Sequence, residues 1–358
     1  MRILTGGILG LLLAAGIAGA QSQENDLQRR AAVIKPCPDE LKWQKIPWGI
    51  DLLEGQRLAR AERRPIFLWG GAGAPLERGS GVPEGMRSGP LSDDEVIRRV
   101  STMFVPVAIN LWEVRADRGP AGDLLRSVRQ QMDQYQGFWI VSPEGKTLAM
   151  PTWKEHKEAA SAICRAMDDV LKTVGPLKPR DAKPVDPLPN RGTGVQPDGS
   201  VTLAICGRLM HRGQPDGPIM LDSVKLEAAE WVLFAPPGSG RTQEWTIPDR
   251  VARKLIGALA PAPRGMDFHP EGARKAELQA KVESVKGGKA RILLSGTWEA
   301  EGVREGAPYS GSATSEGVAL YDVEKKSLLS LLLVFTGKYG NARETRESGA
   351  VVEWKRQP

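Results

Sequence analysis

A proline-rich segment divides the chain into two parts of different character. Residues 176–197 contain six prolines and few apolar side chains. Proline lacks a backbone N–H and fixes φ near −65°, so this composition predicts an extended, semi-rigid linker over 176–199. The length of 358 residues also favours two domains, because one domain commonly has about 100–200 residues.

The first twenty residues have the pattern of a secretory signal peptide. Arg2 precedes an apolar run from Ile3 to Ile17, and the small residues Ala18-Gly19-Ala20 follow it. The run is shorter than the roughly 20 apolar residues of a spanning helix and is interrupted by glycines. We therefore expect cleavage near Ala20, an N-terminal arm over 21–40, and a secreted or periplasmic protein with no later membrane segment.

Charge and cysteine content limit the classes of ligand. The formal net charge is +6, but acidic residues are interleaved with the basic ones, and no basic stripe typical of nucleic-acid binding is present. Cys37, Cys164 and Cys206 are far apart in sequence and show no metal-ligand spacing with the histidines. We expect no metal, no cofactor and no nucleic-acid partner, and we interpret Cys164 as a buried thiol. Whether any two cysteines form a disulfide stays open.

Residues 41–175 alternate between helical and strand patterns. A helix is predicted over 52–63, with Asp51 as its cap, and a buried strand over 66–69. Glycines and prolines predict a loop over 77–90. The further elements expected are a helix opened by a capping box at Ser92 and Glu95, an edge strand over 105–110 that contains Pro106, a helix over 123–134, strands over 138–141 and 147–150, and a helix over 154–174.

Residues 200–358 have the patterns of an antiparallel sheet. Strands are predicted over 201–206 and 231–234, followed by a helix that starts at Pro248. Alternating apolar residues then predict paired strands around the glycine turn at 287–288. Further strands are expected over 317–323, 328–335 and 350–354. These patterns predict an α+β domain built on an antiparallel sheet.

The first part resembles the thioredoxin-like proteins. Its elements follow the order of that fold, and two local segments are similar to family motifs, namely Arg64-Pro65-Ile66-Phe67-Leu68-Trp69 and Val141-Ser142-Pro143-Glu144-Gly145-Lys146. The resemblance implies an α/β thioredoxin-like domain over 41–175.

The same resemblance shows that the family's reactive residues are missing. It aligns Gly73-Ala74-Pro75-Leu76 with the Cys-x-x-Cys motif and Gln136-Gly137 with the position of the cis-proline. Disulfide exchange requires an attacking thiolate and a second, resolving thiol. We therefore expect no catalytic residue here and no disulfide oxidoreductase activity.

The remaining expectation is a binding surface for a protein or peptide. It consists of residues at the carboxyl ends of the first two strands and the loop before the third: Trp69, Gly73, Ala74, Pro75, Leu76, Trp112, Tyr135 and Gln136. Aromatic side chains provide large contact areas at low entropy cost. Two alternatives stay open. The tryptophans could serve only as core packing, or the protein could be a diverged enzyme, either a single-thiol redox protein or a hydrolase that uses the C-terminal domain.

Overall fold

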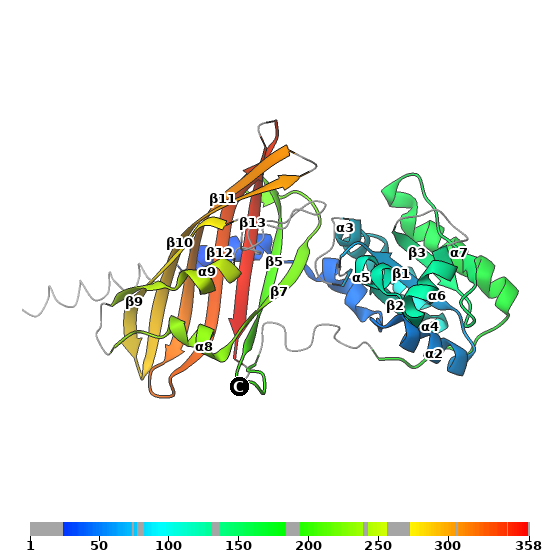
Figure 1. Cartoon of the computed structure of the whole chain (residues 1–358), viewed down its shortest axis with the longest axis horizontal. Helices are drawn as coiled ribbons and strands as arrows, with labels where there is room; N and C mark the ends of the chain where they lie inside the picture. The colour runs from blue at the N-terminus through cyan, green and yellow to red at the C-terminus, as the bar shows by residue number, and fades with distance from the viewer. Residues whose placement is uncertain are drawn as a thin grey trace, which may run out of the picture.

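The computed structural model describes residues 24–73, 75–76, 82–129, 136–183, 194–238, 243–255, 273–304, 307–341 and 343–356. Its N-terminal half consists of helices around a small mixed sheet, and its C-terminal half is built on a large antiparallel sheet (Figure 1). The predicted signal peptide lies outside the described residues. Among the described helices, none has the length and apolar character needed to cross a membrane.

The small sheet has four strands in the order β2-β1-β3-β4. They are β1 (Ile66–Gly71), β2 (Val105–Asn110), β3 (Gly137–Val141) and β4 (Thr147–Ala149). β1 runs parallel to β2 and antiparallel to β3, which pairs antiparallel with β4. The edge position predicted for β2 is confirmed. Edge strands tolerate proline, and there the Pro106 carbonyl accepts a hydrogen bond from Gly49 N at 2.9 Å.

Helices bury both faces of this sheet. They are α2 (Leu52–Glu62), α3 (Val82–Ser88), α4 (Asp94–Met103), α5 (Leu111–Ala116), α6 (Pro120–Arg129) and α7 (Ala159–Val174), with 3-10 turns η1 (Pro38–Lys45), η2 (Pro90–Ser92) and η3 (His156–Glu158). Residues of α4 and α7 pack with Phe67 and Phe138, whereas residues of α2 and α6 pack with Leu68 and Trp139. All of β1 is therefore buried, as its continuous apolar run predicts.

Local signals located the start of α2 correctly and the start of α4 one residue too early. The Asp51 carboxylate accepts a hydrogen bond from Glu54 N at 2.9 Å. For α4 the predicted cap, Ser92, is wrong. Asp93 caps this helix by accepting from Glu95 N and Val96 N at 2.9 and 3.1 Å, whereas the Ser92 hydroxyl donates to the carbonyl of Arg87.

The loop predicted over 77–90 is also wrong in part, because α3 occupies Val82–Ser88. Pro83 lies in the first turn of this helix, where a missing N–H breaks no intrahelical bond. Burial then favours the helix, since Met86 and Arg87 both pack inside the structure. Residues 77–81 lie outside the described residues. The helix α5 had no signal in the sequence analysis, and the predicted helix over 154–174 begins as η3, with α7 starting at Ala159.

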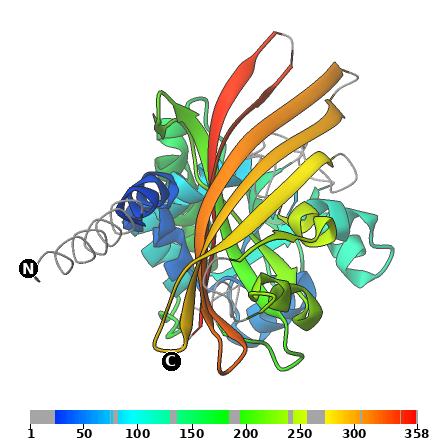
Figure 2. The ribbon, with the colours of Figure 1, turned by 90° about the vertical axis from the view of Figure 1, so that its left-hand side faces the viewer.

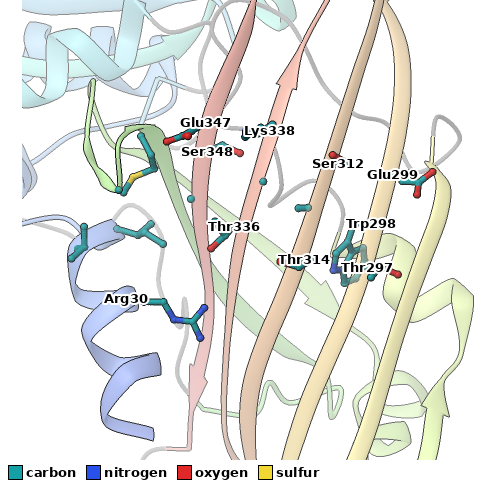
Figure 3. Close-up of a pocket in the computed structure, with 17 residues that line it drawn as sticks. Arg30, Thr297, Trp298, Glu299, Ser312, Thr314, Thr336, Lys338, Glu347 and Ser348 are labelled. Atoms are coloured by element: carbon teal, nitrogen blue, oxygen red, sulfur yellow. The ribbon is translucent and has the colours of Figure 1, made fainter. Parts of the chain in front are cut away.

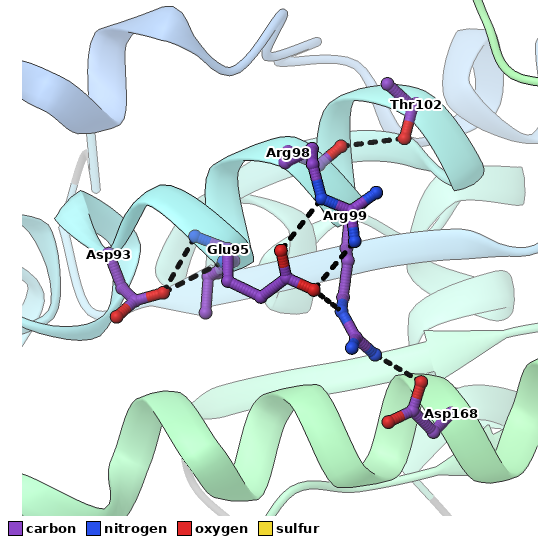
Figure 4. Close-up of polar contacts among 7 residues, drawn as sticks. Asp93, Glu95, Arg98, Arg99, Thr102 and Asp168 are labelled. Atoms are coloured by element: carbon purple, nitrogen blue, oxygen red, sulfur yellow. Dashed lines mark hydrogen bonds and ion pairs between the residues drawn. The ribbon is translucent and has the colours of Figure 1, made fainter.

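A charged cluster joins α4 to α7 (Figure 4). The Glu95 carboxylate accepts hydrogen bonds from Arg98 at 2.8 and 2.7 Å and from Arg99 at 2.5 Å, and Arg99 also forms an ion pair with Asp168 of α7. The guanidinium groups of Arg98 and Arg99 lower the pKa of Glu95 from 4.5 to about 2.

This shift predicts a pH dependence of stability. The pKa of Glu95 is lower in the folded state, so its stabilising contribution is present above pH 4.5 and is lost as the pH falls toward about 2. In Glu95→Gln this contribution is absent. We expect the urea midpoint of the variant to fall less than that of the wild type between about pH 5 and pH 3. Glu113→Gln, an exposed carboxylate on α5, is the control. Equal losses in the wild type and Glu95→Gln would contradict the assignment.

The large sheet contains nine strands in the order β6-β5-β13-β12-β11-β10-β9-β8, with β7 paired to β5. They are β5 (Val201–His211), β6 (Gln214–Pro215), β7 (Met220–Leu226), β8 (Glu244–Ile247), β9 (Ala273–Lys286), β10 (Lys289–Arg304), β11 (Ala307–Asp322), β12 (Ser327–Gly340) and β13 (Thr345–Lys355). Every pairing is antiparallel, which confirms the predicted sheet type. Several strands extend beyond the predicted ranges. The prediction relied on alternating apolar residues, and small polar residues replace these at the strand ends.

Helices lie on both faces of this sheet (Figure 2). One face packs against α8 (Ala228–Trp231), η4 (Val232–Phe234) and α9 (Asp249–Lys254). The predicted strand over 231–234 is therefore wrong. Glu227 N donates to the Glu230 carboxylate at 2.9 Å and closes a helical turn instead.

The opposite face carries a helix formed by residues 24–34, part of the predicted N-terminal arm. Leu27, Ala31 and Ile34 pack on apolar residues of the sheet. Ion pairs join Arg30 to Glu316 and Lys35 to Glu353. The helix formed by residues 24–34 is thus held against strands of the C-terminal half.

Buried arginines connect the two halves. Arg208 of β5 donates to the Glu40 carboxylate at 2.9 Å and to the carbonyl of Ile34 at 2.8 Å. Arg87 of α3 is fully buried and donates to the carbonyl of Ile219 at 3.4 Å. One apolar cluster contains residues of both halves, so the halves share part of their core.

Candidate functional site

The structure separates the residues predicted to form a binding surface. Trp69 is only 1% exposed, and its ring lies 5.6 Å from Trp48 and 6.0 Å from Phe138. Leu76 is also buried, whereas Trp112 at the start of α5 is 48% exposed. Ala74 and Tyr135 lie outside the described residues. Trp69 is thus part of the core.

Two predicted residues, Trp69 and Gln136, meet at a pocket of about 220 Å³. The remaining lining residues come from β1, α3, β3 and the segment after β4: Gly70, Val82, Pro83, Met86, Gly137 and Trp153. The Gln136 side chain is held in place because its Oε1 accepts a hydrogen bond from Ala72 N at 3.1 Å.

The segment aligned with the thioredoxin dithiol lies beside this pocket. Gly73 has a φ of 83°, a conformation that favours glycine. Pro75 packs over Gly71, where a Cβ would lie 3.0 Å from both Pro75 Cβ and Pro83 Cγ. The turn therefore folds back against the wall of the pocket.

Sequence reasoning missed Trp153, Met86, Val82 and Pro83. The last three were missed because the segment 77–90, which contains them, was predicted as a loop. Trp153 is an aromatic residue shortly after β4, and this position was the signal available in the sequence. Its ring lies 6.1 Å from Phe138, so it extends the same aromatic cluster to the pocket.

The chemistry of the lining suits binding. It offers two indole rings, a thioether and one amide, and none of the described residues that line it carries a thiol or an ionisable group. Its volume lies below the roughly 300–1,000 Å³ of sites for whole small molecules. A pocket of this size suits one apolar side chain of a larger partner.

The cysteines lie elsewhere. Cys37 is exposed, Cys164 is half-buried and Cys206 is buried; all three are described, and no disulfide joins any two of them. Burial raises the pKa of the Cys164 thiol, which keeps it protonated and weakly nucleophilic at neutral pH. In the described part of the chain, no group of three or more His, Cys, Asp or Glu side chains could hold a metal ion.

A larger groove, of about 640 Å³, lies on the large sheet beside helix 24–34 (Figure 3). The sequence analysis did not identify it. The available signal was the run of small residues over 310–315 in β11, where serine, glycine, alanine and threonine leave space above the strand.

Comparison of the chain with protein-family models, with curated proteins and with solved structures gave no match. The function is therefore inferred from the two cavities and from the residues that line them.

Proposed function

We propose that the protein is an exported, non-redox thioredoxin-like binding protein that holds a peptide segment of a partner at the pocket beside Trp69, Gln136 and Trp153. The observation that carries the proposal is the position of this pocket. It adjoins Gly73–Leu76, the segment aligned with the family's dithiol, and its lining offers contact surface in place of reactive groups. The order of helices and strands and the edge position of β2 support the thioredoxin-like assignment.

The lining supports a peptide as the ligand. Indole rings and the thioether of Met86 provide polarisable, apolar surface for one side chain of a partner. The amide oxygen of Gln136 is fixed because it accepts a hydrogen bond from Ala72 N. The NH₂ group of the same amide can donate to a carbonyl of the partner.

The absence of thiols at the pocket predicts binding that does not depend on cysteine. We expect a triple variant, Cys37→Ser with Cys164→Ala and Cys206→Ala, to bind an unfolded polypeptide within about twofold of the wild type, because a change of this size is about 0.4 kcal/mol and no contact at the site is lost. Reduced, carboxymethylated α-lactalbumin is a suitable probe since it can form no mixed disulfide.

Fluorescence anisotropy of the labelled probe measures this binding, and an insulin-reduction assay run in parallel measures redox activity. The proposal predicts bound probe and no insulin reduction above background. Insulin turnover that disappears when one cysteine is replaced would instead support the single-thiol enzyme.

A further inference from the structure

The floor of the large groove is formed by two rows of side chains in register across four neighbouring strands. The first row contains Thr297, Thr314, Thr336 and Gly349, each paired with the next across β10, β11, β12 and β13. The second row, two residues away from the first on each strand, contains Glu299, Ser312, Lys338 and Glu347. All these residues line the groove (Figure 3).

The wall of the groove is the end of helix 24–34, which contributes Arg30, Val33 and Ile34. Ile34 lies so close to the sheet that a Cβ on Gly349 would be 2.8 Å from its side chain. Arg30 forms ion pairs with Asp26, at 3.0 Å, and with Glu316, so its charge is neutralised within the protein. The groove volume of about 640 Å³ falls within the roughly 300–1,000 Å³ typical of small-molecule sites.

The lining argues against two common classes of ligand. An extended peptide cannot add as a strand, because β10 to β13 are each paired on both sides. Among the described lining residues, a planar ring finds no stacking partner, since Trp298 is the aromatic residue in that set, is fully buried, and donates its Nε1–H to Ser315 at 2.9 Å. Threonine methyl groups, Val33, Ile34 and Met210 instead provide surface for an aliphatic chain.

The second row provides charges of both signs. Lys338 and Glu347 are directly opposite each other on β12 and β13, and both are exposed. Within the described part of the chain, neither takes part in an ion pair. A headgroup that carries one negative and one positive charge would complement this pair.

We propose that this groove binds a single-chain zwitterionic phospholipid. The acyl or alkyl chain lies along the threonine row against Val33 and Ile34. The phosphate of the headgroup contacts Lys338, and its ammonium group contacts Glu347. The site is separate from the pocket beside Trp69 and does not depend on the proposed peptide binding. Either activity can therefore fail alone.

The probe is n-dodecylphosphocholine, titrated as a monomer below its critical micelle concentration by isothermal titration calorimetry. Shortening the chain to decyl should weaken binding about tenfold, because two methylene groups leave the groove. Glycerophosphocholine, which has the head without the chain, should not bind detectably. Equal affinity for dodecyl and decyl chains, binding of the head alone, or binding at micellar concentrations only would each overturn the proposal.

Matched variants locate the site. Thr314→Trp places an indole on the floor and should weaken binding by about tenfold or more. Lys338→Glu should weaken it about fivefold, as expected for a reversed, solvent-exposed charge contact. Thr246→Trp on β8 and Lys286→Glu on β9 make the same changes at exposed positions outside the groove and should bind as the wild type does. Far-UV circular dichroism checks folding. Wild-type affinity in folded Thr314→Trp or in Lys338→Glu would overturn the assignment.

Discussion

Replacing Trp69 by alanine should lower the free energy of unfolding by about 3–5 kcal/mol, the range typical of a large aromatic residue removed from a core. The side chain is 1% exposed, and its ring packs against Trp48 and Phe138. Its loss leaves a cavity between β1 and its neighbours that these rings cannot fill. Urea unfolding followed by far-UV circular dichroism measures the change.

Trp112→Ala is the matched control because it removes the same side chain from a position that is 48% exposed. We expect a loss below about 1 kcal/mol there. Similar losses in the two variants would show that Trp69 does not have the core role assigned to it.

Replacing Arg87 by methionine should lower the free energy of unfolding by about 3–5 kcal/mol, as expected when one partner of a buried ion pair is removed. Arg87 is fully buried and lies 3.7 Å from the carboxylate of Glu84, a residue that is itself 4% exposed. Its guanidinium also lies over the Trp43 ring and donates to the carbonyls of Pro75 and Ile219. These contacts join α3 to both halves of the protein.

The second member of the pair gives a sharper test. The variant that combines Glu84→Gln with Arg87→Met removes the carboxylate of this pair together with the guanidinium, so it should be more stable than Arg87→Met alone. Arg126→Met, on the surface of α6, should change stability by less than about 1 kcal/mol. A loss below about 1 kcal/mol in Arg87→Met would contradict the role of this arginine in joining the halves.

Sequence reasoning succeeded in the N-terminal half where the signal is local. The apolar run of β1, the carboxylate cap of α2 and the proline in an edge strand are each decided by residues close in the chain. The helix α3 was missed because Pro83, Gly85 and Gly89 are typical of a loop. Its formation depends on the burial of Met86 and Arg87 against distant segments, which no local pattern contains.

In the C-terminal half, apolar alternation predicted the paired strands β9 and β10 correctly, and the alternating residues Leu278, Ala280, Ile292 and Leu294 are buried. The ends of β11 and β12 were missed because their small polar residues carry no period-two apolar signal. The groove was missed for a related reason. Its threonine row is formed by the register of the successive strands β10, β11 and β12, which no pattern within one strand contains.

The candidate pocket was predicted in part. The thioredoxin-like alignment brought Trp69 and Gln136 together, and both line the pocket. Trp112 follows the adjacent strand but belongs to α5 and does not line it. Trp153 lies outside the segments that the alignment singled out, and its position follows from the packing of its ring on Phe138.

The most direct test of the proposed function compares Trp153→Ala with Trp112→Ala in binding of labelled, carboxymethylated α-lactalbumin. Trp153 is half-buried at the pocket, so its removal deletes contact surface without emptying the core. We predict about 30-fold weaker binding for Trp153→Ala, the effect of an interface anchor worth about 2 kcal/mol. Trp112→Ala should stay within about twofold of the wild type. Unchanged affinity in folded Trp153→Ala, or an equal loss in both variants, would contradict binding at this pocket.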